Sequence, residues 1–176
     1  YGARLSFTET DNLFNYFDII DEDEILNPNF SNQFDYKENT QALYFSGQKS
    51  FLEKWEAKLG LRYELTQTEG FSLTVNQTNK NDYSKLFPTA YLAYTANDNY
   101  SFSLNYGRRI ARPNFGYLNP FRFVINPYSY SEGNPFLQPA FTDNIEFEYA
   151  FKDNLITNIY YSYTDDDFEQ VTKINT

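Results

Sequence analysis

The amino-acid sequence predicts an all-β fold, in which antiparallel strands form a segment of a transmembrane β-barrel. Apolar and polar residues alternate with a period of two along much of the chain, as in strands whose two faces meet different surroundings. Hydrophobic residues make up 41% of the chain and aromatic residues 20%, yet the mean hydropathy is −0.66. Apolar and polar residues must therefore be finely interleaved. Short turns also alternate with long connections, which is typical of outer-membrane barrels.

The composition excludes most familiar active sites. The chain has no His and no Cys, so it holds no Ser-His-Asp triad, no thiolate nucleophile and no zinc or iron site built from imidazole and thiolate. Its 24 acidic residues outnumber 14 basic ones, whereas a nucleic-acid-binding surface is basic. No apolar run reaches the ~18 residues of a membrane helix. We therefore expect no cofactor and no nucleic-acid partner.

Strands are predicted wherever the alternation is clear. Between residues 99 and 109, for example, Phe102 and Leu104 share one face, whereas Ser101 and Ser103 share the other. The pattern, weaker in two places, predicts strands near residues 1–9, 34–50, 55–67, 84–96, 99–109, 141–151 and 155–165.

The predicted connections differ in length at the two ends of the strands. Strands of this length match the ~9–11 residues that cross a bilayer at a tilt. Short turns are predicted near 51–54, 97–99 and 152–154, and long extracellular loops at 11–33, 67–82 and 110–140.

Aromatic residues stand on the apolar face at both ends of the predicted strands. Such rows are the girdles expected at two membrane interfaces. The alternative is that these rings form the core of a soluble β-sandwich, in which strands alternate equally. The row nearest the short turns contains Trp55, Tyr94, Tyr100 and Phe151, and the opposite row contains Tyr63, Tyr106, Tyr161 and Tyr163.

The strand count and the absence of methionine predict a piece of a longer protein. The chain begins with Tyr1 and contains no Met, whereas an open reading frame begins with Met. About seven strands cannot close a bacterial single-chain barrel, whose strand number is even and starts at about eight. We therefore expect further strands from sequence outside this chain.

Six short motifs occur in a fixed order along the chain. In this order, residues 86–171 resemble the C-terminal barrel of TonB-dependent outer-membrane receptors, of the Bacteroidetes-type outer membrane protein beta-barrel family. One departure is Ala140, where that family often has Glu. The motifs are Gly60-Leu61-Arg62-Tyr63-Glu64, Leu86-Phe87-Pro88-Thr89-Ala90, Tyr106-Gly107-Arg108-Arg109-Ile110-Ala111-Arg112-Pro113, Leu118-Asn119-Pro120-Phe121, Glu132-Gly133-Asn134-Pro135 and Leu137-Gln138-Pro139.

The resemblance implies a barrel of about 22 strands, of which this chain supplies about seven. It also implies an N-terminal plug domain, which lies outside this chain, and loops that capture a ligand for import by the TonB energy-coupling system. Outer-membrane lipid, the plug and TonB are then the partners, and a surface lipoprotein is a further candidate. The expected location is the outer membrane of a Gram-negative bacterium.

Charged residues on the polar faces of the strands must point into the barrel, because a basic residue at the lipid-facing midplane costs about 2–4 kcal/mol. One hypothesis is that these residues contact a plug or line the solute path. The other is that they form neutralising pairs with neighbouring strands. The candidates are Arg62, Glu64, Arg109, Glu146 and Glu148.

The segment 110–140 combines aromatic and arginine residues with five prolines, whose φ is fixed. It is a candidate for binding sugar rings or flat chelates, with arginines for anionic groups. The alternative is that the segment folds into the barrel mouth and packs on itself. The candidate residues are Arg112, Phe115, Tyr117, Phe121, Arg122, Tyr128 and Tyr130.

Acidic residues raise two further possibilities, which the pattern disfavours. The run Asp21–Glu24 lacks the spacing of an EF-hand, so we expect a solvated acidic surface rather than a Ca²⁺ site. Glu146 and Glu148 lie about 7 Å apart by strand rise, within the range of glycosidase carboxylates, but such pairs are ordinary on a barrel wall. We therefore predict no metal site and no enzyme.

Two functions stay open for this barrel. The first is a receptor and transporter that binds a ligand at the cell surface and imports it across the outer membrane. The second is a non-transporting barrel that serves as a scaffold or subunit of a larger outer-membrane complex, with its loops as protein contacts.

Overall fold

The chain folds around one curved antiparallel sheet. The computed structural model describes residues 1–152 and 154–172, in which seven strands pair in the order β1-β4-β5-β6-β7-β10-β11. The predicted all-β, antiparallel fold is confirmed. The strands are β1 (Gly2–Phe14), β4 (Asn32–Phe51), β5 (Trp55–Ser72), β6 (Gln77–Asn97), β7 (Tyr100–Ala111), β10 (Ala140–Phe151) and β11 (Leu155–Asp165).

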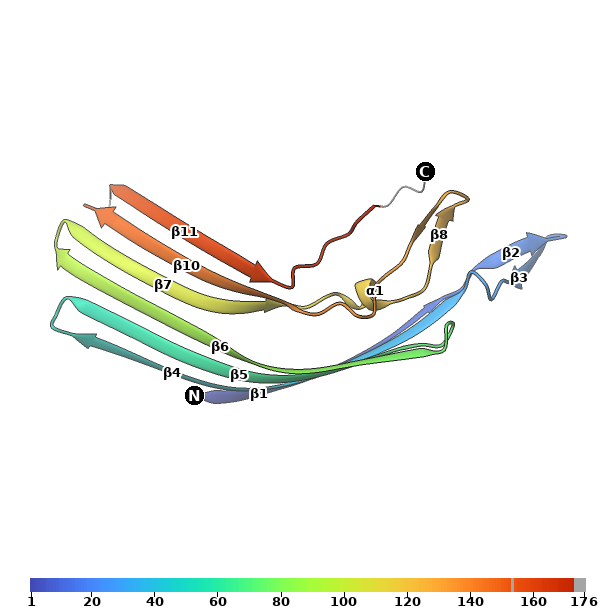
Figure 1. The fold of residues 1–176 in the computed structure, drawn as a ribbon, viewed down its shortest axis with the longest axis horizontal. Helices are drawn as coiled ribbons and strands as arrows, with labels where there is room; N and C mark the ends of the chain where they lie inside the picture. The colour runs from blue at the N-terminus through green and yellow to red at the C-terminus, as the bar shows by residue number, and fades with distance from the viewer. Residues whose placement is uncertain (153, 173–176) are drawn as a thin grey trace.

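Two small hairpins and one helical turn lie in the connections. They are β2 (Phe17–Ile20) with β3 (Asp23–Leu26), β8 (Phe123–Asn126) with β9 (Ser129–Ser131), and α1 (Phe115–Leu118). The sheet is a single curved layer, with its short turns at one end and α1 and β8 above its concave side (Figure 1). We call the concave side the inner face and the convex side the outer face. No helix in the described part of the chain is long and apolar enough to cross a membrane.

Three strands continue well beyond the expected length. β4, β5 and β6 contain 20, 18 and 21 residues, about twice the ~9–11 that cross a bilayer. The loop predicted at 67–82 is therefore wrong, because pairing continues to Ser72 and Gln77. The apolar–polar alternation ends earlier than the pairing, since outer-face residues such as Glu69 and Lys80 are polar in this extension.

The other two predicted loops also contain ordered structure. In 11–33, β1 continues to Phe14 and the β2–β3 hairpin follows. Its turn holds Asp21 and Glu22 at φ 53° and 74°, a conformation that costs L-residues roughly 1–2 kcal/mol each. In 110–140, α1 and the β8–β9 hairpin lie between β7 and β10. Both hairpins escaped prediction because strands of three or four residues carry little period-two signal.

The outer face is apolar and exposed, whereas the inner face is polar. Leu5 on β1, Leu59 on β5 and Ile159 on β11 are 67%, 65% and 63% exposed, but Glu64 on the inner face is 3% exposed. A soluble domain buries its apolar side chains instead. In the described ranges, these exposed side chains show that no second layer covers the outer face. The soluble-sandwich alternative is therefore wrong, and the polarity is that of a wall between lipid and a polar lumen.

A row of aromatic rings crosses the outer face near the short turns. The ring centroids of Phe51 and Trp55 lie 6.2 Å apart, those of Trp55 and Tyr94 4.4 Å, those of Tyr94 and Phe102 6.3 Å, and those of Phe102 and Tyr149 5.4 Å. Five neighbouring strands thus contribute to one continuous band. Such a band fits a membrane interface, where amphipathic rings concentrate.

The assignment of the faces predicts opposite outcomes for two neighbours on β7. Leu104 is registered with Leu92 and Phe147 on the outer face, whereas Ser103 lies on the inner face beside Glu148. We expect Leu104→Arg to destabilise the full-length protein in lipid vesicles by about 2–4 kcal/mol. Ser103→Arg is the matched control and should change the unfolding free energy far less, because its side chain stays in a polar environment. Urea unfolding followed by tryptophan fluorescence measures both, and equal losses would contradict the assignment.

Candidate functional site

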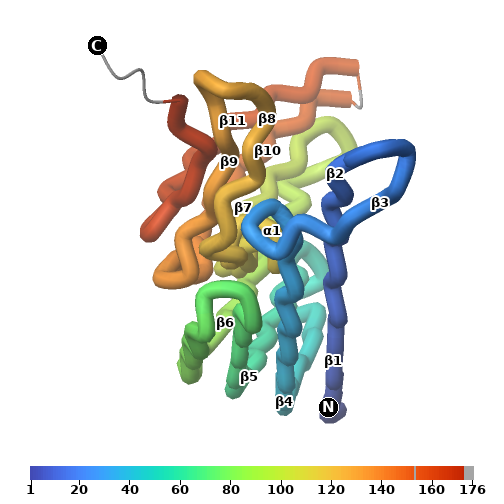
Figure 2. Tube along the Cα trace, turned by 90° about the vertical axis from the view of Figure 1, so that its right-hand side faces the viewer, coloured from blue at the N-terminus to red at the C-terminus, as the bar shows by residue number. Residues whose placement is uncertain are grey.

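Residues 112–139, here called the cap segment, fold back over the inner face. Viewed from the end of the long strands, the cap segment lies between the β1 side and the β11 side of the curved sheet (Figure 2). Leu118 and Leu137 of this segment line a small cleft together with Phe34 and Gly70 of the wall. The Phe34 ring lies over Gly70, 3.0 Å from where a Cβ would stand. An apolar contact thus joins the cap segment to β4 and β5.

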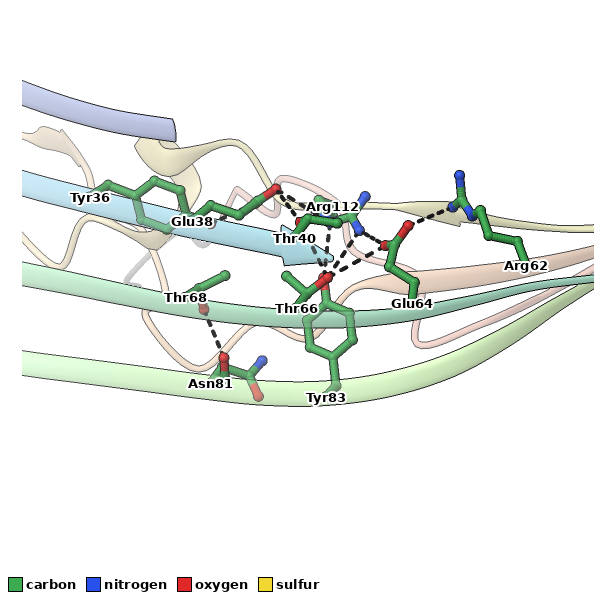
Figure 3. Close-up of polar contacts among 10 residues, drawn as sticks. All are labelled: Tyr36, Glu38, Thr40, Arg62, Glu64, Thr66, Thr68, Asn81, Tyr83 and Arg112. Atoms are coloured by element: carbon green, nitrogen blue, oxygen red, sulfur yellow. Dashed lines mark hydrogen bonds and ion pairs between the residues drawn. The ribbon is translucent and has the colours of Figure 1, made fainter. Parts of the chain in front are cut away.

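Arg112 fixes the start of the cap segment to the inner face of the wall (Figure 3). Its Nη2 pairs with the Glu64 carboxylate and donates to Thr66 Oγ1 at 3.3 Å. Its Nε donates to the Tyr83 hydroxyl at 2.9 Å and lies 3.7 Å from Glu38 Oε1. These five residues, from β4, β5, β6 and the cap segment, are called the Arg112 cluster.

Two carboxylates and two arginines balance their charges at this point. Arg62 Nη2 lies 2.9 Å from Glu64 Oε2, so each oxygen of Glu64 faces a guanidinium. The Arg62 guanidinium also lies over the Phe87 ring, 4.7 Å from its centroid. Because Glu64 is nearly inaccessible, losing either arginine would leave a buried and poorly compensated negative charge.

Two tyrosines bring uncharged hydroxyl groups to the cluster. Tyr36 and Tyr83 lie on the inner face of the strand extension, beyond the apolar band. Burial and the Glu38 carboxylate raise the pKa of Tyr36, and burial raises the pKa of Tyr83. Both phenols therefore stay protonated at neutral pH, and the Tyr36 hydroxyl donates to Glu38 Oε2 at 3.1 Å.

The second half of the cap segment is fixed by backbone contacts. The Gly133 amide donates to the Asn119 carbonyl at 3.0 Å, and the Asn134 amide donates to the Tyr117 carbonyl at 2.7 Å. A Cβ on Gly133 would stand 2.5 Å from the Tyr117 carbonyl oxygen and 2.6 Å from that of Asn119. The segments around Gly133 and around Tyr117–Asn119 approach each other too closely for a side chain at position 133. This close approach explains the glycine of the Glu132–Pro135 motif.

Tyr128 and Tyr130 of the β8–β9 hairpin, and Arg122 just before it, are predicted ligand-binding residues that reach solvent. Arg122 Nε donates to Glu132 Oε2 at 2.9 Å, and its guanidinium lies 4.8 Å from the centroid of the Tyr130 ring. Tyr128, at the hairpin tip, is 98% exposed. The cation of Arg122 is therefore already paired, whereas the Tyr128 ring is free on both faces.

The structure places five of the seven predicted ligand-binding residues in two groups. Tyr117, Tyr128 and Tyr130 present exposed rings. Arg112 is held by two carboxylates, and Phe121 is buried beside Phe123 with ring centroids 4.9 Å apart. The first group keeps the properties of a recognition surface, while the second holds the cap segment in place. Phe115 in α1 is half-buried, and Arg122 is exposed but ion-paired.

By register, all five charged residues predicted for the inner face lie on it. In the described part of the chain, two of them are ion-paired and three are not. Arg62 and Glu64 form an ion pair. Arg109 is registered with Thr142, Glu146 with Asn105 and Glu148 with Ser103. Within residues 1–152 and 154–172, none of these three forms an ion pair. Ion pairs thus neutralise only the first two residues, within β5 and through Arg112 of the cap segment, and not by pairing with a neighbouring strand. The same residues contain no group of three or more acidic side chains that could hold a metal ion.

Sequence reasoning missed Glu38, Thr66 and Tyr83 of the cluster. Glu38 lies in one of the two predicted strands with the weaker pattern, and Tyr83 lies between the predicted loop 67–82 and the predicted strand 84–96. The signal that could have placed them is the even-numbered series Phe34, Tyr36, Glu38 and Thr40, which shares one face of β4. Without the partner strand, that series does not identify Arg112 as its counterpart.

Gly133 offers a direct test of how the cap segment is held. Gly133→Ala places a methyl group against two backbone carbonyls, so we expect a loss of about 1–3 kcal/mol by overpacking and faster proteolysis within residues 112–139. Gly47→Ala is the matched control, because nothing lies within 4 Å of its Cβ position. Limited proteolysis of the full-length protein with mapped cleavage sites measures the effect. Equal cleavage of both variants would contradict the proposed close packing.

A double-mutant cycle tests the Arg112 cluster. Arg112→Gln leaves Glu64 buried with a single arginine, and we expect a destabilisation of about 3–5 kcal/mol. Glu64→Gln in the same chain removes the uncompensated charge and should recover part of that loss. Urea unfolding in lipid vesicles measures the three variants. Strictly additive losses would mean that the two side chains do not interact.

The whole chain, residues 1–176, matches the model of one protein family, described as the outer membrane protein beta-barrel family. The match includes the cap segment and both small hairpins as well as the seven long strands. No curated protein is significantly similar to this sequence.

Proposed function

The chain belongs to the outer membrane protein beta-barrel family, and we propose that it forms part of a TonB-dependent receptor that imports a ligand into a Gram-negative cell. The observation that carries this proposal is the set of unpaired charges on the inner face, Arg109, Glu146 and Glu148. A charged side chain on a wall needs water or an opposite charge. A lumen that holds a plug domain and conducts a polar ligand supplies both, so the plug and the TonB system are the proposed partners.

The exposed rings of the cap segment supply the surface for ligand capture. They are Tyr117 of α1, and Tyr128 and Tyr130 of the β8–β9 hairpin, and both elements lie away from the short turns of the sheet (Figure 1). Aromatic faces stack on sugar rings and flat chelates. Because Arg112 and Arg122 are both ion-paired, we propose stacking rather than arginine–anion contacts as the main recognition. Binding and transport, without catalysis, is the proposed activity.

One observation favours the second candidate, a scaffold or subunit of a larger outer-membrane complex. The β2–β3 hairpin extends beyond the rim of the sheet (Figure 1) and exposes Ile19 and Ile20 at 68% and 51%. Exposed aliphatic residues on a projecting hairpin are typical of protein contacts. A surface lipoprotein is the proposed partner for this hairpin, and such a contact is compatible with transport.

Uptake in a deletion strain tests the transport proposal. Complementation with the full-length gene should restore growth on at least one scarce nutrient, and a protonophore should abolish its uptake. Glu146→Gln with Glu148→Gln should lower that uptake by about tenfold, a change of about 1.4 kcal/mol, at unchanged surface amount. Asp166→Asn with Asp167→Asn is the matched control beyond β11. Restored growth that survives the protonophore, or a full-length gene without a plug domain, would contradict the proposal and favour the scaffold.

A further inference from the structure

An open groove crosses the outer face of β4, β5 and β6 where the apolar band ends. Its volume is about 340 Å³, comparable with the smaller ligand sites of proteins. The outer-face side chains that line it are Asn39, Gln41, Leu65, Gln67, Asp82 and Ser84.

The register places the groove between an apolar zone and a charged zone. We call residues that are registered with one another across the strands a rung. The rung next to the groove on the side of the short turns contains Leu43, Tyr63 and Leu86. One rung farther out, Glu9, Lys37, Glu69 and Lys80 alternate in charge across four strands. Lys37 lies 2.5 Å from Glu9, and Lys80 lies 2.9 Å from Glu69. The charged rung is therefore internally paired, and the groove below it is not part of that network.

The polar side chains of the groove have unused hydrogen-bonding capacity. In the part of the chain that the structure describes, Asn39, Gln41, Gln67, Asp82 and Ser84 form no side-chain hydrogen bond and no ion pair. Asn39 Oδ1 is inaccessible and has no partner there. A polar group removed from water without a partner costs roughly 1–3 kcal/mol. Asn39 Oδ1 carries that cost, whereas the side chains of Gln41, Gln67, Asp82 and Ser84 are exposed and free to bind a ligand without breaking a bond within the protein.

The height of the groove identifies that ligand as a membrane lipid. Trp55 in the aromatic row and Leu65 are ten residues apart on β5. At a rise of about 3.3 Å and a tilt of about 40°, they are separated by ~25 Å along the membrane normal. That distance is the height of the apolar band of such barrels. The groove therefore lies at the headgroups of the outer leaflet.

The chemistry of the lining side chains selects the kind of headgroup. Amides donate and accept hydrogen bonds, and Asp82 accepts them, as sugar hydroxyls require. The two nearest cations, Lys37 and Lys80, are paired with carboxylates, so a bare phosphate would meet Asp82 without a free counter-charge. Phe7 of β1, on the rung of Asn39, is 73% exposed and offers an aromatic face for a sugar ring.

From this geometry we propose that the groove on β4, β5 and β6 binds the sugar headgroup of an outer-leaflet glycolipid. The hydroxyls bond to the amides, and the acyl chains lie on the leucines below. The site rests on membership of the barrel family and not on transport. Its failure and the failure of the proposed import are therefore separate results.

The test uses the full-length protein in nanodiscs that contain one probe lipid at a time, with native mass spectrometry of the released protein. The probes are digalactosyl diacylglycerol, phosphatidic acid and the free galactose disaccharide. We expect retention of the glycolipid alone, and a loss of about tenfold in its retention for Asn39→Ala with Gln67→Ala. Asn105→Ala with Asn158→Ala, on the inner face, is the matched control and should retain it.

Heat-dependent gel mobility of each variant shows that the barrel is folded. Equal retention by both double variants would overturn the proposed site. Retention of phosphatidic acid at the level of the glycolipid would overturn the sugar specificity. Binding of the free disaccharide to the wild type, lost in Asn39→Ala with Gln67→Ala, would overturn the lipid as its source.

Discussion

The structure depends on one constraint, the pairing of every backbone N–H and C=O group in a medium without water. In lipid, an unpaired group costs several kcal/mol, so only helices and closed sheets cross a membrane. The long strands meet this condition where antiparallel ladders join them, in the order β1-β4-β5-β6-β7-β10-β11, and in the described residues one edge of β1 and one edge of β11 have no neighbouring strand. Once the backbone is paired, the side chains need only satisfy the medium on each face. This freedom explains why exposed leucines and buried carboxylates occur within one strand, as for Leu65 and Glu64.

The cap segment is held in place differently, because it contains none of the seven long strands. Side chains that contact the inner face fix it, chiefly Arg112 through its ion pairs with Glu64 and Glu38. An arginine suits this position because its planar guanidinium contacts several acceptors at once. Close backbone packing at Gly133 fixes the other end. The rings of Tyr117 and Tyr128 are therefore carried on a stiff support, on which the proposed stacking of a ligand would cost less entropy.

The sequence was sufficient for the strands and their faces but not for the site. Alternation placed Arg62, Glu64, Glu146 and Glu148 on the inner face, because the two faces of a membrane wall differ in polarity. Beyond the apolar band the outer face is mostly polar, so the extensions of β5 and β6 were predicted as a loop although their backbone pairing continues. The Arg112 cluster was invisible for another reason. Its pair joins residues 48 positions apart, and no local pattern encodes which carboxylate a loop arginine will meet.

The central claim is that β5 crosses the membrane with an apolar outer face that ends at Leu65. The chain has no Cys, so single cysteines at successive positions from Leu59 to Glu69 of the full-length protein can be labelled with a membrane-impermeant thiol reagent in native outer membranes. We expect outer-face positions to be protected up to Leu65 and accessible from Gln67 onward, whereas the inner-face position Arg62 is labelled and the buried positions Glu64 and Thr66 are not. Uniform labelling from Leu59 to Leu65, or protection that continues through Gln67 and Glu69, would contradict it.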